Sequence, residues 1–80
     1  MNPDGVPASW VSSRPSRPEA VARRHPHHEG VKGLLARRRP EEEIRAIRAP
    51  REAWSRKVGR RGYGRVRDGV LVEVVWTAVN

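Results

Sequence analysis

The sequence predicts an α+β fold in which two short helices pack on an antiparallel sheet of three or four strands that ends in a β-hairpin. Asp68-Gly69 lies between two runs of strand-like composition, and this pair is typical of the two-residue type I′ turn of a hairpin. Upstream of the hairpin, apolar residues recur at helical spacing, and prolines divide the chain into short segments. Together these observations place the helices before the hairpin.

Residues 1–18 are predicted to form a disordered or loosely docked arm, and residues 19–80 to form a single small domain. The arm is rich in proline and serine and holds few apolar side chains, so it has little surface to bury. In an alternative interpretation, Trp10-Val11 adds a short edge strand to the sheet. A chain of 80 residues has room for one small core.

The first helix is expected at residues 28–38. Val31, Leu34 and Leu35 lie at positions i, i+3 and i+4 and therefore share one face of a helix. Gly30 and Gly33 lower the helix propensity of the same segment. The arginines that follow suit the negative end of the helix dipole.

The second helix is expected at residues 41–49. Pro40 is suited to the first position of a helix, and the three glutamates after it suit the positive end of the helix dipole. Ile44 and Ile47 form a narrow apolar stripe, and Pro50 ends the helix because it disfavours helical geometry in the residue before it.

Three strands are expected after this helix, at residues 53–58, 61–67 and 70–79. A regular two-residue turn would pair Arg67 with Val70, Arg65 with Val72, Tyr63 with Val74, and Arg61 with Trp76. The predicted core consists of apolar residues from both helices and from the last strand, namely Leu34, Leu35, Ile44, Ile47, Val72, Val74 and Trp76.

The chain carries a formal net charge of +8, and all of its basic residues except Lys32 and Lys57 are arginine. Arginine favours planar, bidentate contacts with phosphate or carboxylate, so the composition points to an acidic partner. The arginine content is also explained by the coding bias of a GC-rich genome, and composition alone does not separate the two explanations. No apolar run approaches the ~20 residues of a membrane span and no leader pattern is present, so a cytoplasmic protein without a membrane partner is expected.

Arg61, Tyr63 and Arg65 alternate along a predicted strand and therefore share one face of the sheet. Guanidinium groups beside an aromatic ring suit RNA, because arginines hold phosphates while the ring stacks on a base. Arg37, Arg38 and Arg39 are expected to make flanking contacts with the same nucleic acid. In the alternative interpretation these arginines only protect a strand edge or meet an acidic protein.

The histidines His25, His27 and His28 form one short cluster around Pro26. No metal site is expected there, because the chain has no cysteine and no compact carboxylate set lies beside the cluster. No cofactor is expected either. His28 is a candidate proton carrier because imidazole titrates near neutral pH.

The stretch from about residue 25 to residue 77 resembles the small α+β proteins related to BrnT and RelE toxins. The resemblance rests on Arg37, on Pro40-Glu41-Glu42-Glu43-Ile44, on Ile47 and Pro50, and on Tyr63-Gly64-Arg65-Val66-Arg67-Asp68-Gly69-Val70-Leu71-Val72-Glu73-Val74-Val75-Trp76-Thr77. Pro40 stands where such proteins usually have a serine or threonine cap, and the family histidine aligns one position from His28. Neither the N-terminal strand that opens many such folds nor a strand after Val79 is evident in the sequence.

This resemblance implies cleavage of messenger RNA and an antitoxin protein as a partner. Catalysis of that kind depends on positioning a 2′-hydroxyl group and on stabilising phosphate charge, which arginines and an aromatic residue can do. The catalytic candidates are therefore Arg61, Tyr63, Arg65 and His28. The alternative function is a non-enzymatic basic module that binds nucleic acid or an acidic protein through the same surface. The oligomeric state is left open by the sequence.

Overall fold

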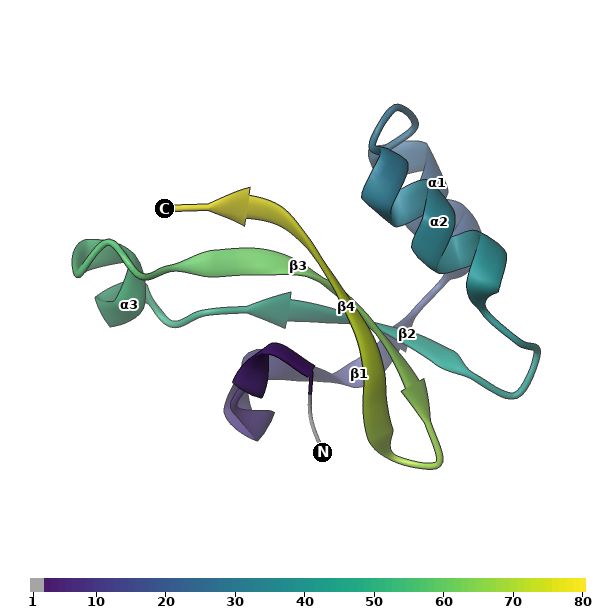
Figure 1. Cartoon of the computed structure of the whole chain (residues 1–80), viewed down its shortest axis with the longest axis horizontal. Helices are drawn as coiled ribbons and strands as arrows, with labels where there is room; N and C mark the ends of the chain where they lie inside the picture. Colours follow the sequence, from purple (N-terminus) through teal and green to yellow (C-terminus); the bar gives the residue numbers. More distant parts are fainter. Residues whose placement is uncertain (1–2) are drawn as a thin grey trace.

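The computed structural model describes residues 3–80 and contains one antiparallel sheet with the strand order β1-β2-β3-β4 (Figure 1). In chain order the elements are two 3-10 turns (Pro3–Gly5 and Ala8–Trp10), β1 (Val11–Ser16), α1 (Pro18–Arg24), α2 (Glu29–Arg37), β2 (Glu43–Arg48), α3 (Arg51–Ser55), β3 (Arg60–Arg67) and β4 (Val70–Val79). The predicted α+β class, with helices on an antiparallel sheet that ends in a hairpin, is confirmed. The helix predicted at residues 28–38 is α2, whereas α1 was not anticipated.

The hairpin turns at Asp68-Gly69 as predicted, with φ angles of 50° and 78° that suit a type I′ turn. Its register differs from the prediction beyond the two pairs next to the turn. The ladder shifts between Arg65 and Val66 and again between Arg61 and Gly62, so β4 carries two bulges. Each bulge adds one unpaired residue to β4, and between the two bulges every residue of β4 lies one position away from its predicted partner.

The helix predicted at residues 41–49 is wrong, because this segment contains β2, which pairs with both β1 and β3. Ile44 packs on the helix-facing side of the sheet and Ile47 packs on the opposite side. Both faces of β2 are covered, so its sequence shows no alternation, and the spacing of three between the isoleucines imitates a helical stripe.

The strand predicted at residues 53–58 is also wrong, because this segment contains most of the short helix α3. The helix ends in a paired hydrogen-bond motif. The N–H of Val58 donates to the carbonyl of Ala53 at 2.9 Å, and the N–H of Lys57 donates to the carbonyl of Trp54 at 3.1 Å. Lys57 occupies the left-handed position of this motif with a φ of 59°, a position at which glycine is usual.

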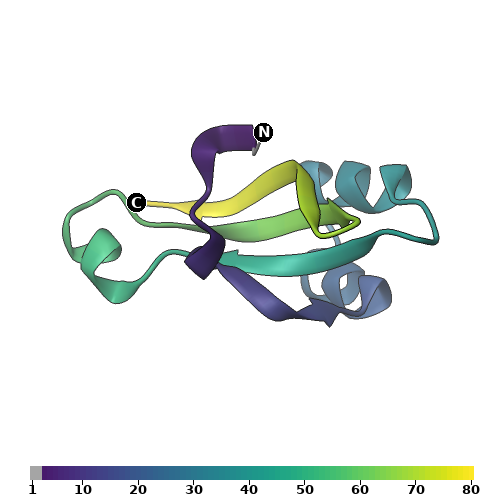
Figure 2. The same ribbon diagram turned by 90° about the horizontal axis from the view of Figure 1, so that it is seen from below.

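The segment predicted to be a disordered or loosely docked arm lies against the sheet over the part that the structure describes; residues 1–2 lie outside it. Its end supplies the edge strand β1, close to the Trp10-Val11 alternative. Val6 is buried, and the indole N–H of Trp76 donates to Asp4 at 3.0 Å. Figure 2 shows this segment crossing the sheet from β1 toward β4.

The core forms two clusters on opposite faces of the sheet. Under α1 and α2 the buried residues are Val21, Val31, Leu34, Ile44 and Tyr63; under the N-terminal segment they are Val6, Ile47, Val66 and Leu71. Among the predicted core residues, Leu35, Val74 and Trp76 are partly buried against these clusters. Val72 is 37% exposed, so its placement in the core is wrong. No helix within residues 3–80 is both long and apolar enough to cross a membrane.

Candidate functional site

The helix-facing side of the sheet carries three rows of side chains that run across β2, β3 and β4. Strand pairing sets the rows as Ile44–Arg65–Glu73, Ala46–Tyr63–Val75 and Arg48–Arg61–Ala78. The first row faces the hairpin tip, the second belongs to the core, and the third opens toward α3. Arg65 and Arg61 therefore share a face but lie in different surroundings on either side of Tyr63.

Arg65 is held by two carboxylates. Its Nη1 atom donates to both oxygens of Glu42 at 3.0 Å, and its Nε atom donates to Glu73 at 3.1 Å. Glu42 is buried and also accepts from Arg67 and from the backbone N–H of Arg39. The Arg39 N–H, followed by Arg65 and Arg67, lowers the pKa of Glu42 to about 2 against the opposing effect of burial. Arg65 is thus a structural residue of an ion-pair network.

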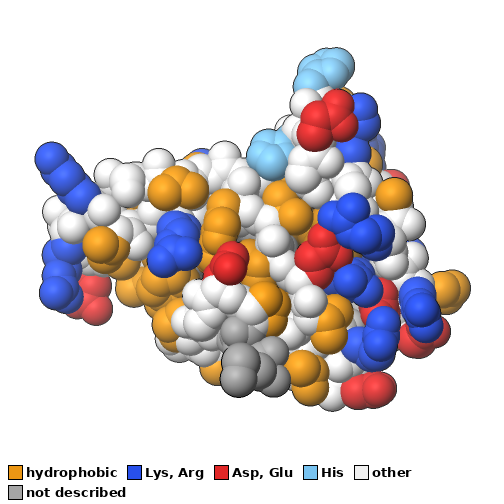
Figure 3. Space-filling view, in the orientation of Figure 1, with side chains coloured by type: hydrophobic (Ala, Val, Ile, Leu, Met, Phe, Trp, Pro, Cys, Tyr) orange, Lys and Arg blue, Asp and Glu red, His pale blue; other side chains and the backbone are white. Residues whose placement is uncertain are grey.

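The arginines at the end of α2 belong largely to the same network. The Nε atom of Arg37 donates to both oxygens of Glu73, and this contact, together with Arg65, lowers the pKa of that carboxyl. Arg38 donates to two backbone carbonyls in the turn before β2, whereas Arg39 is exposed. Figure 3 shows basic and acidic side chains interleaved on this side of the molecule. Two of the three arginines in the predicted flanking site at 37–39 therefore make hydrogen bonds within the fold.

A cleft of about 290 Å³ opens at the other end of the sheet, beside the end of α1. Its lining consists of Arg24, His25, Ala46, Ile47, Arg48, Arg61, Gly62, Tyr63 and Thr77. This lining contains three arginines and no carboxylate. Among the described residues, the guanidinium groups of Arg24, Arg48 and Arg61 have no ion-pair or hydrogen-bond partner. Arg48 lies directly opposite Arg61, where like charges repel, so this end of the sheet favours an anion.

His25 and Tyr63 form a polar pair in the cleft. The Tyr63 hydroxyl lies 3.3 Å from Nε2 of His25, within hydrogen-bond distance, and the two rings meet edge to face. Burial lowers the pKa of His25, and the nearby His28, Arg24 and Arg61 lower it further. A lowered pKa keeps the imidazole neutral at pH 7, the form that accepts a proton.

The structure divides the residues that were predicted as a site. Arg61 and Tyr63 line the cleft, but Tyr63 is only 9% exposed, so the prediction of an exposed tyrosine on which a base could stack is wrong. Arg65 lies outside the cleft lining. His28 caps α2, where its Nδ1 atom accepts from the N–H of Val31 at 3.2 Å.

Sequence reasoning missed three cleft residues, Arg24, His25 and Arg48, although His25 belongs to the histidine cluster that it considered. Arg24 and His25 end the unanticipated helix α1. Arg48 faces Arg61 only because residues 43–48 form a strand instead of a helix. The available signal was weak: α1 and β2 each contain two arginines and one glutamate.

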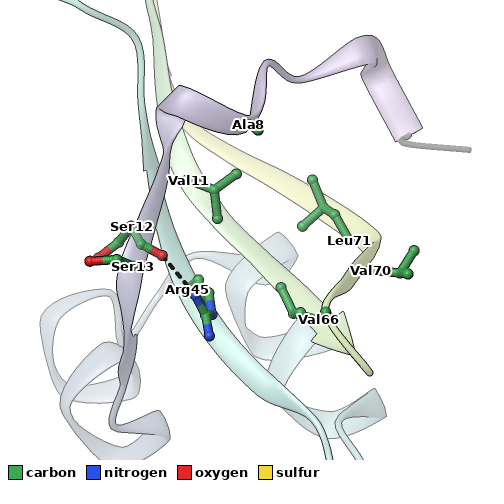
Figure 4. Close-up of a pocket in the computed structure, with 9 residues that line it drawn as sticks. Ala8, Val11, Ser12, Ser13, Arg45, Val66, Val70 and Leu71 are labelled. Atoms are coloured by element: carbon green, nitrogen blue, oxygen red, sulfur yellow. Dashed lines mark hydrogen bonds between the residues drawn. The ribbon is translucent and has the colours of Figure 1, made fainter.

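A second cavity of about 430 Å³ lies on the opposite face, between β1 and the hairpin tip (Figure 4). Val11, Val66 and Leu71 contribute apolar walls. Arg45 contributes the only charge in the lining, and this charge is already matched because the guanidinium donates to Glu43 and to the carbonyl of Ser12. Matched charge and apolar walls make this cavity a weaker candidate for an anionic ligand than the arginine-lined cleft.

Metal ligands do not cluster in the described part of the chain, since residues 3–80 contain no group of three or more histidine or acidic side chains that could hold a metal ion.

Comparison of the chain with protein-family models, with curated proteins and with solved structures found no match.

Proposed function

We propose that this chain is an RNA-directed protein of the toxin type, which binds a phosphodiester in the arginine-lined cleft and cleaves the RNA beside it. The observation that carries the proposal is the convergence of three unpaired arginines on the His25–Tyr63 pair, in a lining without a carboxylate. Phosphate suits this cleft because guanidinium groups bind its oxygens in a planar, bidentate manner.

The cleavage step requires a base and charge stabilisation. Neutral His25 accepts the proton of the ribose 2′-hydroxyl, and the resulting alkoxide attacks phosphorus. The bond between the 2′-oxygen and phosphorus forms as the bond to the 5′-oxygen breaks, and the leaving oxygen takes a proton from the imidazolium. Arg24, Arg48 and Arg61 stabilise the extra negative charge of the phosphorane. The products are a 2′,3′-cyclic phosphate and a 5′-hydroxyl end.

Two further features support this proposal. β1 supplies an opening strand of the kind that many folds related to BrnT and RelE toxins have, although residues 43–48, which contribute to the resemblance, form the strand β2 instead of a helix. The cleft is basic and open, which suits an acidic antitoxin that would cover it in the inactive state. An antitoxin partner would explain why a toxic surface is left without carboxylates of its own.

The test incubates the full chain with a fluorescently labelled single-stranded RNA and with the same sequence as DNA. We expect the chain to cleave the RNA, leaving cyclic phosphate ends, and to leave the DNA intact. His25→Ala should lower the cleavage rate by about 10²–10⁴-fold while RNA binding persists. Arg61→Ala should weaken both binding and cleavage, whereas Arg14→Ala, which removes an exposed arginine outside the cleft lining, should change neither.

Binding without cleavage in this assay would favour the alternative function, a non-enzymatic basic module. Absence of RNA binding by the wild-type chain would contradict the proposal, and would leave only a module that binds DNA or an acidic protein. In cells, the toxin function predicts growth arrest on expression, relieved by the product of a neighbouring gene and absent in His25→Ala.

A further inference from the structure

The end of the molecule that carries α3 is strongly and one-sidedly basic. Between the end of β2 and the start of β3 the exposed cations are Arg48, Arg51, Arg56, Lys57 and Arg61, against the single acid Glu52. None of these side chains takes part in an ion pair among the described residues. Figure 3 shows basic side chains projecting from this end, in contrast with the interleaved charges near the hairpin tip.

This basic end continues directly from the cleft. Arg48 and Arg61 line the cleft, and Arg51 begins α3 three residues after Arg48. The strands are tied together here, since the N–H of Ala49 donates to the carbonyl of Arg60 at 2.9 Å. Arg51, Arg56 and Lys57, which we name the α3 tract, therefore extend the positive surface of the cleft outward along one element.

Lys57 supplies a second, independent observation. It occupies the left-handed position at the end of α3, where glycine would avoid the steric conflict between Cβ and the backbone. No contact of its side chain within the described residues compensates for this strain. The end of α3 requires the left-handed backbone at this position but not a lysine side chain, so the strain points to a role for the side chain, which adds an ammonium group next to Arg56 in the tract.

We infer that the α3 tract binds the backbone of single-stranded RNA next to the phosphate held in the cleft, so that the protein contacts several consecutive phosphates. This inference rests on the proposed function and extends it to the strandedness and the path of the substrate. A single strand fits because the cleft phosphate must enter a concave site between α1 and the sheet, and an unstacked strand can bend inward where a duplex is stiff.

The tract makes a quantitative prediction about salt. Three cleft arginines alone would give a slope of log affinity against log salt of about −2, and the three tract cations would bring it to about −4. Between 50 and 200 mM salt, affinity should therefore fall about 300-fold for an RNA of about ten nucleotides that covers both regions. A trinucleotide that reaches only the cleft should lose about 20-fold.

The experiment measures fluorescence anisotropy of both RNAs with the full chain and with the triple variant Arg51→Ala/Arg56→Ala/Lys57→Gly. The variant should bind the longer RNA with the shallow slope and bind the trinucleotide as the wild type does. The control variant Arg14→Ala/Arg17→Ala/Lys32→Ala removes the same charge elsewhere on the surface and should keep the steep slope. Equal slopes for wild type and the tract variant would overturn the inference and leave the cleft proposal intact.

The single variant Lys57→Gly separates binding from folding. Its melting temperature should stay unchanged or rise, because glycine relieves the strain at φ 59°, while the salt slope for the longer RNA becomes shallower by about 0.7. An unchanged slope would show that this lysine does not contact RNA. A wild-type chain that binds neither RNA would contradict the proposed function itself, and the tract with it.

Discussion

Replacement of Arg65 by alanine is expected to destabilise the protein without removing the proposed RNA site. The side chain is 15% exposed, and it donates to Glu42 and Glu73 through contacts of 3.0–3.1 Å. A hydrogen bond to a charged group contributes about 1.5–3 kcal/mol, and breaking a buried ion pair costs about 3–5 kcal/mol. Glu42 keeps Arg67, and Glu73 keeps Arg37, so we expect a loss of about 2–3 kcal/mol in the free energy of unfolding.

Urea titration followed by circular dichroism measures this loss. In a domain of this size it corresponds to a fall in melting temperature of about 8–24 °C. Arg65→Lys should fall between wild type and Arg65→Ala, because one ammonium group does not reproduce the fork of contacts to two carboxylates. Below the unfolding transition, Arg65→Ala should bind RNA with the wild-type salt slope.

Arg61→Ala is the matched variant on the same strand face. It should change stability by no more than about 0.5 kcal/mol, because the side chain is exposed and unpaired, yet it should weaken RNA binding. If Arg65→Ala left the unfolding midpoint unchanged and abolished RNA binding, the division between a structural arginine and a cleft arginine would be refuted.

Three other outcomes follow from named contacts. The pKa of Glu42 is about 2 in the folded protein against an ordinary value of 4.5, so its contribution to stability is complete above about pH 4.5 and is lost as the pH falls toward 2. Glu42→Gln should remove this acid transition from a series of thermal melts at different pH values. Leu71→Ala should cost about 2–4 kcal/mol in urea titration, whereas Val72→Thr should stay within about 0.5 kcal/mol, and equal losses would contradict the bulge. Because the pKa of His25 is lowered in the folded protein, its contribution to stability is complete above about pH 6.5 and is lost as the pH falls below that value. Phosphate binding favours the imidazolium, so the affinity for phosphate should increase over the same fall in pH. A His25→Gln variant should show neither dependence in thermal melts and phosphate titrations.

The hairpin was predictable because its signal is local: Asp68-Gly69 sets the turn whatever the rest of the chain does. The register was not, because the bulges depend on what lies around the strands. One bulge brings Glu73 opposite Arg65, a pairing that an uninterrupted ladder would have given to Val72. A pattern of alternating residues contains no information about such an insertion.

The two wrong elements have separate causes. Glutamates 41–43 suit the positive end of a helix dipole and so predict a helix start. In the fold Glu42 is instead a buried partner of arginines on β3, a long-range role that local rules do not describe. The short α3 has few residues with which to express a helical period. For the candidate site, Arg61 and Tyr63 were found because they lie on the predictable hairpin, whereas Arg48 depended on β2 and was missed.

The two bulges of β4 have a consequence for the tendency of this protein to aggregate. The strand is a valine-rich segment at the edge of the sheet, and among residues 3–80 no strand pairs with its outer side. Its composition is typical of segments that seed aggregates. A second chain that added to this edge would have to copy both interruptions and accommodate Glu73, which is held by Arg37 and Arg65. The irregular pairing of β4 therefore disfavours the addition of a second chain to this edge while the protein stays folded.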